Sequence, residues 1–106
     1  AYASHLQNVT KYGDEAIISG TAMAQNIGKF AAEDLPKVQK AAIGLAAAYK
    51  MDLNTAFQLI GRASKGQTGS LTRYGVVLDT TKSKEEQFAE LLEKGAENFF
   101  IAKEQA

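Results

Sequence analysis

Apolar residues recur at intervals of three and four along most of the chain, a spacing that places side chains on one face of an α-helix. Residues 34–66 carry two such runs, separated by a break at Asp52. Asp34 and Asp52 are expected to cap the two helices, Pro36 suits the first turn of the first helix, and Gly66 suits the end of the second. The short break between the runs predicts an antiparallel helical hairpin. The two stripes are Leu35, Val38, Ala42, Leu45 and Tyr49, followed by Leu53, Ala56, Phe57, Ile60 and Ala63.

Residues 1–32 carry weaker helical patterns. Tyr2–Lys11 is weakly amphipathic, and a further helix is expected from Asp14, where acidic residues in a first turn suit the helix dipole. Gly20 and Gly28 are each expected to weaken that helix by about 1 kcal/mol relative to alanine. Its apolar stripe is expected at Ile17, Ala24, Ile27 and Ala31.

Residues 83–106 predict a long C-terminal helix. Ser83 and Glu86 have the spacing of a capping box, in which each residue satisfies a backbone N–H of the other. Residues 67–82 are expected to form a turn and a connector that is extended near 76–80. Together the segments predict an all-α fold of about four to five helices in one domain. The stripe of the last helix is expected at Phe88, Leu91, Leu92, Gly95, Phe99 and Ala102.

Composition limits the classes of function. Twelve Lys and Arg residues balance twelve Asp and Glu residues among the 106, whereas nucleic-acid binders usually carry a basic excess. The absence of cysteine excludes disulfides, cysteine-based zinc sites and a thiol nucleophile. Much of the 45% apolar fraction is alanine, which buries little surface, so a thin core is expected.

The longest uncharged run, Ala16–Gly28, is interrupted by polar residues and is shorter than the roughly 20 apolar residues that a membrane-spanning helix needs. No signal peptide is expected, because the first residues lack a basic region followed by an apolar one. The chain begins with Ala1 instead of methionine, and we expect it to be a fragment of a much longer protein.

The segment Gly61–Thr68 nearly matches the phosphate-loop pattern G-x-x-x-x-G-K-[ST]. Gln67 stands where the pattern requires the lysine that reaches the outer phosphates, and the segment closes a helix instead of following a strand. His5 is the only histidine, and no nearby residue suggests a metal or catalytic partner for it. We therefore expect no catalytic residue, cofactor, metal or small-molecule substrate.

Two groups of residues are candidates for macromolecular contacts. Arg62, Lys65 and Arg73 are expected either to form a basic patch, beside which Tyr74 stacks on a base, or to be solvated charges at helix ends. The zero net charge favours the second interpretation.

The second group is apolar. Adjacent helical residues point about 100° apart, so Phe99 and Phe100 cannot share one narrow stripe, and one of them is expected to be exposed or to pack on a partner. Leu45 and Tyr49, in the alanine-rich segment 41–50, complete this candidate partner or self-association surface. The alternative is an ordinary core with one peripheral phenylalanine.

Several weak motifs follow one another in an order that resembles the helical domain of bacteriophage and prophage tail tape measure proteins. They are an acidic-Leu-Pro-Lys start at Asp34–Lys37, an Asp-Leu-x-x-Ala helix start at Asp52–Ala56, and the turn Ser70–Val76. The resemblance covers most of Asp14–Phe100.

That resemblance implies a structural component of the virion that sets tail length and occupies the tail tube during assembly in the bacterial cytoplasm. It implies contacts with tail tube, chaperone and baseplate proteins, self-association, no membrane contact in this segment and no enzymatic residues. Two alternatives stay open: a nucleic-acid-binding module that uses Arg62, Lys65, Arg73 and Tyr74, and an adaptor domain that binds a host protein.

Overall fold

The computed structural model describes residues 14–28 and 30–105, which form an all-α fold without a strand in that part of the chain. The all-α prediction is therefore confirmed, while the helix expected at Tyr2–Lys11 lies outside the described residues. In chain order the helices are α2 (Asp14–Ile27), the 3₁₀ helix η1 (Ala32–Asp34), α3 (Leu35–Ala48), α4 (Leu53–Ala63), the 3₁₀ helix η2 (Gly69–Tyr74) and α5 (Lys84–Gln105).

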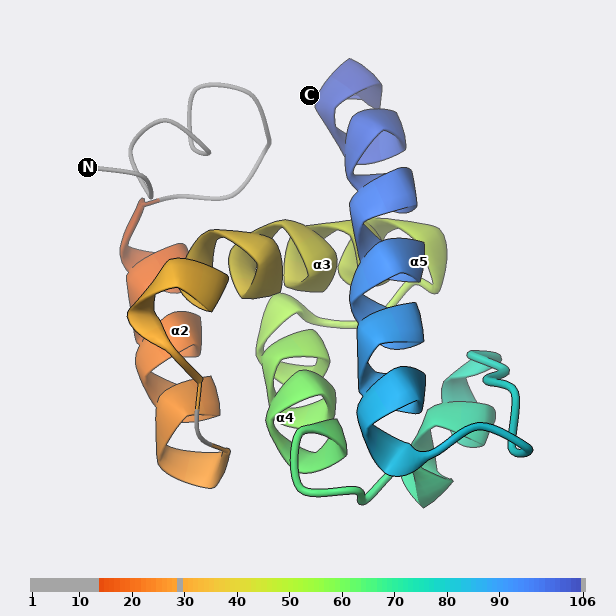
Figure 1. The fold of residues 1–106 in the computed structure, drawn as a ribbon. Coiled ribbons are helices and arrows are strands. Elements are labelled where there is room, and N and C mark those ends of the chain that lie inside the picture. The colour runs from red at the N-terminus through yellow and green to blue at the C-terminus, as the bar shows by residue number, and fades with distance from the viewer. Residues whose placement is uncertain (1–13, 29, 106) are drawn as a thin grey trace.

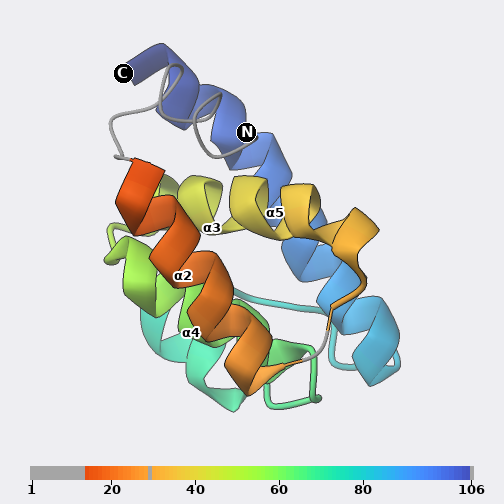
Figure 2. The same cartoon turned by 90° about the vertical axis from the view of Figure 1, so that its left-hand side faces the viewer.

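The helices pack mainly as two pairs, α2 with α4 and α3 with α5. In Figures 1 and 2, α3 lies across the upper ends of α2 and α4, while α5 crosses α3. Residues 41–46 of α3 are all buried, because neighbours cover more than one face of this helix. The largest fully buried side chains are Phe57, Ile17, Ile43, Leu45, Ile60, Leu71, Leu91, Val38 and Val76.

The predicted turn between α3 and α4 is confirmed, although the arms do not lie along each other as antiparallel neighbours, since α3 packs chiefly on α5 and α4 on α2. Lys50 adopts the left-handed conformation (φ 52°), and the N–H of Met51 donates to the carbonyl of Ala46 over 3.2 Å. Asp34 and Asp52 occupy the N-cap positions, but neither side chain makes a capping hydrogen bond. The helix starts were thus placed correctly, without the expected side-chain contribution.

Replacing Lys50 by glycine should raise the free energy of unfolding by about 1 kcal/mol, because a left-handed backbone is costly for residues with a Cβ. The same replacement at exposed Lys37, inside α3, is the matched control and should lower stability by about 1 kcal/mol. Urea unfolding followed by circular dichroism measures both changes. A destabilised Lys50→Gly variant would contradict the assigned turn.

The segment Gly61–Thr68 closes α4 with a Schellman motif. Gly66 has a φ of 85°, the N–H of Gln67 donates to the carbonyl of Arg62 over 3.0 Å, and that of Gly66 donates to Ala63 over 2.9 Å. The segment therefore ends a helix, as expected, and its backbone does not have the strand-to-helix context of a phosphate loop.

The connector after η2 starts with a second motif of the same kind. Gly75 has a φ of 85°, and the N–H of Val76 donates to the carbonyl of Leu71 over 3.1 Å. Val76 is buried, Leu78 is half-buried and Val77 is 69% exposed. The connector expected near 76–80 is therefore present, and it packs Val76 and Leu78 against the core.

The capping box at the start of α5 is confirmed. The N–H of Glu86 donates to Oγ of Ser83, and the N–H of Ser83 donates to Oε1 of Glu86, each over 3.2 Å. In the next turn, buried Gln87 donates to the carbonyl of Lys82 over 3.0 Å and accepts from Oγ1 of Thr68 over 3.3 Å. These bonds attach the connector and the preceding turn to α5.

Glycines set the distance between α3 and α5. A Cβ on Gly44 would collide with the carbonyl oxygen of Gly95, and a Cβ on Gly95 would lie 2.5 Å from Cα of Ala41. The two helices therefore touch backbone to backbone where they cross, which small residues alone permit.

Glycines also line the contact between α2 and α4. A Cβ on Gly20 would collide with the ring of Phe57, and a Cβ on Gly61 would lie 3.0 Å from Cβ of Ile27. Gly20 thus has a packing role that offsets the expected weakening of the helix. The stripe expected for α2 is wrong at Ala31, which is exposed and lies beyond the end of the helix.

Candidate interaction groove between α3 and α5

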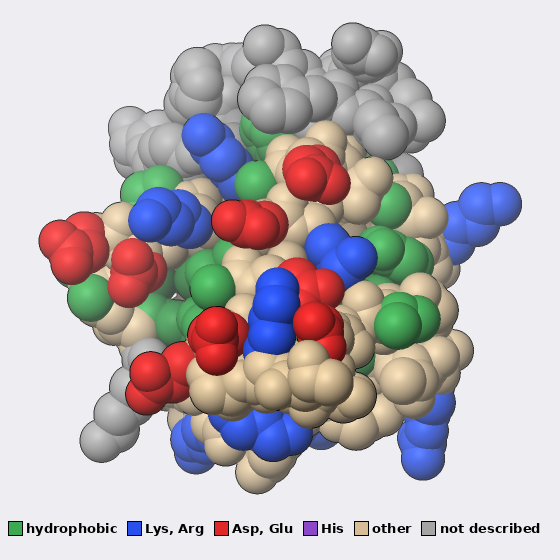
Figure 3. Space-filling view, turned by 45° about the vertical axis from the view of Figure 1, so that its right-hand side comes forward, with side chains coloured by type: hydrophobic (Ala, Val, Ile, Leu, Met, Phe, Trp, Pro, Cys, Tyr) green, Lys and Arg blue, Asp and Glu red, His purple; other side chains and the backbone are tan. Residues whose placement is uncertain are grey.

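The residues of the predicted basic patch lie on two separate turns. Arg62 is in the last turn of α4, Lys65 follows that helix, and Arg73 and Tyr74 end η2. All four are exposed, and neither of the two ion pairs found in the described part of the chain involves them. On the face shown in Figure 3, acidic and basic side chains are interspersed. The two arginines therefore have the positions at helix C-termini that the dipole favours.

Lys65 has different neighbours from those expected. It lines a shallow hollow of about 360 Å³ at the junction of α4 and α5, together with Lys84, Glu85 and Phe88. Nζ of Lys84 donates to Oγ1 of Thr68 over 3.3 Å. Because the hollow carries charges of both signs, it is not a basic site suited to bind phosphate.

Titration of the protein into duplex DNA at low salt should show no saturable binding, because phosphate neutralisation would need a basic surface. Fluorescence anisotropy of labelled DNA measures this. Binding that weakens steeply with salt, and that is lost in an Arg62→Gln/Arg73→Gln variant, would contradict the expectation and favour the nucleic-acid alternative.

The predicted apolar surface is corrected for two of its residues. Leu45 is fully buried and Phe99 is 6% exposed, so both belong to the core of the domain. Tyr49 is half-buried and packs against that core, and the side chain of Phe100 lies outside the described residues. Nζ of Lys40 lies 5.9 Å from the ring centroid of Phe99, which places a cation beside the crossing of α3 and α5.

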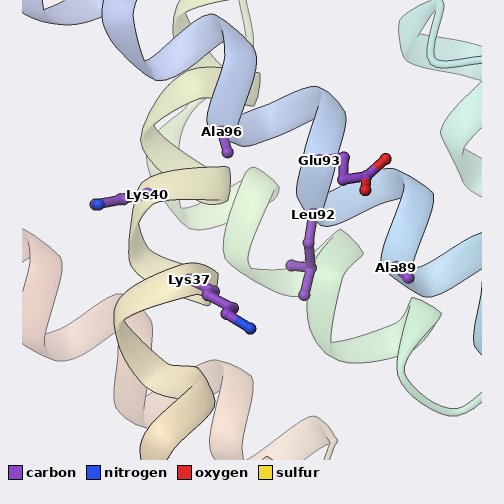
Figure 4. A pocket seen from close by; sticks show the side chains of 6 residues that line it. All are labelled: Lys37, Lys40, Ala89, Leu92, Glu93 and Ala96. Carbon is purple, nitrogen blue, oxygen red and sulfur yellow. The ribbon is translucent and has the colours of Figure 1, made fainter.

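A groove of about 400 Å³ opens beside this crossing. In Figure 4, Lys37 and Leu92 point into the space between the helices, while Lys40 and Glu93 point to opposite sides. Ala89 and Ala96 add small apolar surfaces on α5. The groove thus has an apolar floor between a basic rim on α3 and an acidic rim on α5.

The charges on the two rims are exposed and do not pair across the groove. Both ion pairs found among the described residues involve Glu90, which lies 3.7 Å from Lys82 and 4.0 Å from Lys94. Glu97, one turn beyond Glu93 on α5, is also exposed and extends the acidic rim. Such a surface is suited to contact another protein segment by apolar burial and charge complementarity.

Sequence reasoning missed this groove because it depends on how α3 crosses α5. The available signal was the spacing of Lys37 and Lys40 by three residues and of Glu93 and Glu97 by four, which puts each pair on one helix face.

In the described ranges, no group of three His, Cys, Asp or Glu residues could hold a metal ion. No helix within them is long and apolar enough to cross a membrane.

No protein-family model matches the chain. Neither the curated proteins nor the solved structures provide a match.

Proposed function

We propose that this domain is a structural segment of a phage tail tape measure protein, which sets tail length and occupies the tail tube during assembly. The supporting observation is the order of the three motifs and their place in the fold. Asp34–Lys37 begins α3, Asp52–Ala56 begins α4, and Ser70–Val76 contains most of η2 and the glycine that ends it. The resemblance therefore concerns the residues that start and stop helices.

The proposed role is non-enzymatic and depends on protein contacts. The partners would be tail tube, chaperone and baseplate proteins and further copies of the chain, in the virion and, during assembly, in the bacterial cytoplasm. The groove between α3 and α5, with its apolar floor and exposed rims of opposite charge, supports a role in protein binding.

An epitope tag inserted at exposed Thr80, in the gene that encodes the chain, tests the assignment. The tagged protein should co-purify with tails or tail-assembly intermediates separated from lysates by density gradient. If complete tails form but the tagged protein migrates only with unassembled host proteins, the proposal is overturned. A tag at exposed Asn54, inside α4, is a control for the effect of disrupting the fold.

A further inference from the structure

We propose that the groove between α3 and α5 is a self-association surface, where two copies of this chain pair about a two-fold axis parallel to the groove. The inference deepens the proposed structural role and rests on it. Its basis is the pattern of the groove itself: a basic rim of Lys37 and Lys40, an apolar floor, and an acidic rim of Glu93 and Glu97.

A two-fold interface brings the same patch of both copies together, so the patch must be complementary to itself. Rotation about an axis parallel to the groove puts the basic rim of one copy opposite the acidic rim of the other, and the reverse. Lys37 and Lys40 would then face Glu93 and Glu97 of the second copy twice in one dimer. Rotation about an axis perpendicular to the groove would oppose like charges, which disfavours that arrangement.

The floor of the groove supplies the attraction that exposed ion pairs lack, since such pairs contribute little by themselves. Leu92 is half-buried in the single chain and has apolar surface left to cover. Ala89 and Ala96, on either side of it, are small enough for α3 of the second copy to approach α5 closely. The floor is short compared with a standard interface, so a weak dimer is expected.

Analytical ultracentrifugation over a micromolar-to-millimolar series should show a weight-average mass that rises toward twice the monomer mass. A Lys37→Glu/Lys40→Glu variant and a Glu93→Lys/Glu97→Lys variant should each raise the dimer Kd about tenfold or more, because like charges then face each other. An equimolar mixture of the two variants should restore association, since all four rims are then complementary. Circular dichroism confirms that both variants remain folded.

The matched control for Lys37→Glu/Lys40→Glu is Arg62→Glu/Arg73→Glu, which lowers the net charge by the same amount away from the groove. It should dimerise like the native chain, and its mixture with the Glu93→Lys/Glu97→Lys variant should associate more weakly than the mixture of the two groove variants, because only one of the two facing rim pairs is then complementary. A native chain that stays monomeric, charge variants that dimerise normally, or a mixture that fails to associate would each overturn the inference. The recovery of tagged protein with tails is a separate measurement. It tests the proposed function whether or not the chain forms this dimer.

Discussion

A Gly95→Ala variant should lose about 2–3 kcal/mol of unfolding free energy, although alanine is the better helix former by about 1 kcal/mol. The added Cβ would lie 2.5 Å from Cα and from the carbonyl oxygen of Ala41, which are backbone atoms with no rotamer to change. The helices must separate, and the contacts that surround the crossing loosen with them. Urea unfolding monitored by circular dichroism measures the loss.

Gly69→Ala is the matched control, because nothing lies within 4 Å of a Cβ at that position. It should be neutral or slightly stabilising. Gly44→Ala should be as harmful as Gly95→Ala, and the double variant should cost less than the sum, since both changes push the same two backbones apart. Full native stability of Gly95→Ala would contradict the close crossing.

A Phe57→Ala variant should lose about 4 kcal/mol, a large part of the stability of a domain of this size. Phe57 is fully buried, and its ring fills the space beside Gly20, where α4 meets α2. Removal of the ring therefore leaves a cavity where the two helices meet. Calorimetry or chemical denaturation measures the change.

For Gly20 and Phe57 we expect the effect of Gly20→Ala on stability to change sign when the Phe57 ring is removed. A general loss of stability cannot produce such a change of sign. Gly20→Ala should destabilise the native chain, because its Cβ collides with the ring of Phe57, and should stabilise the Phe57→Ala chain by about 1 kcal/mol. Gly44→Ala, whose neighbours are on α5, should remain destabilising in both backgrounds. An equal effect of Gly20→Ala in both backgrounds would refute the contact.

Local signals in the sequence placed the helices well. Periodicity located α3, α4 and α5, the Ser83 and Glu86 pair marked the start of α5, and Gly66 marked the end of α4. These features depend on residues that are close together in the chain, so they can be predicted from the local sequence. The left-handed Lys50 was missed because no glycine marks it.

Tertiary relations were less accessible. Gly20 was expected only to weaken a helix, yet it receives the ring of Phe57, a residue 37 positions away. Leu45 and Phe99 were expected at a partner surface because nothing in periodicity tells which helix covers them, and α3 and α5 in fact bury them. The groove has the same origin, since Lys37 and Glu93 line it only through that crossing.

The central claim, that this domain is part of a tape measure, is tested most directly by tail length. In-frame deletion of the codons for residues 14–105 should give shorter tails of uniform length in electron micrographs. The decrease should lie between the 38 Å longest dimension of the folded domain and the ~140 Å that the deleted residues 14–105 would span as one straight helix. Replacement by an unrelated helical segment of equal length should restore much of the lost tail length. Tails of unchanged mean length in the deletion phage would contradict the account.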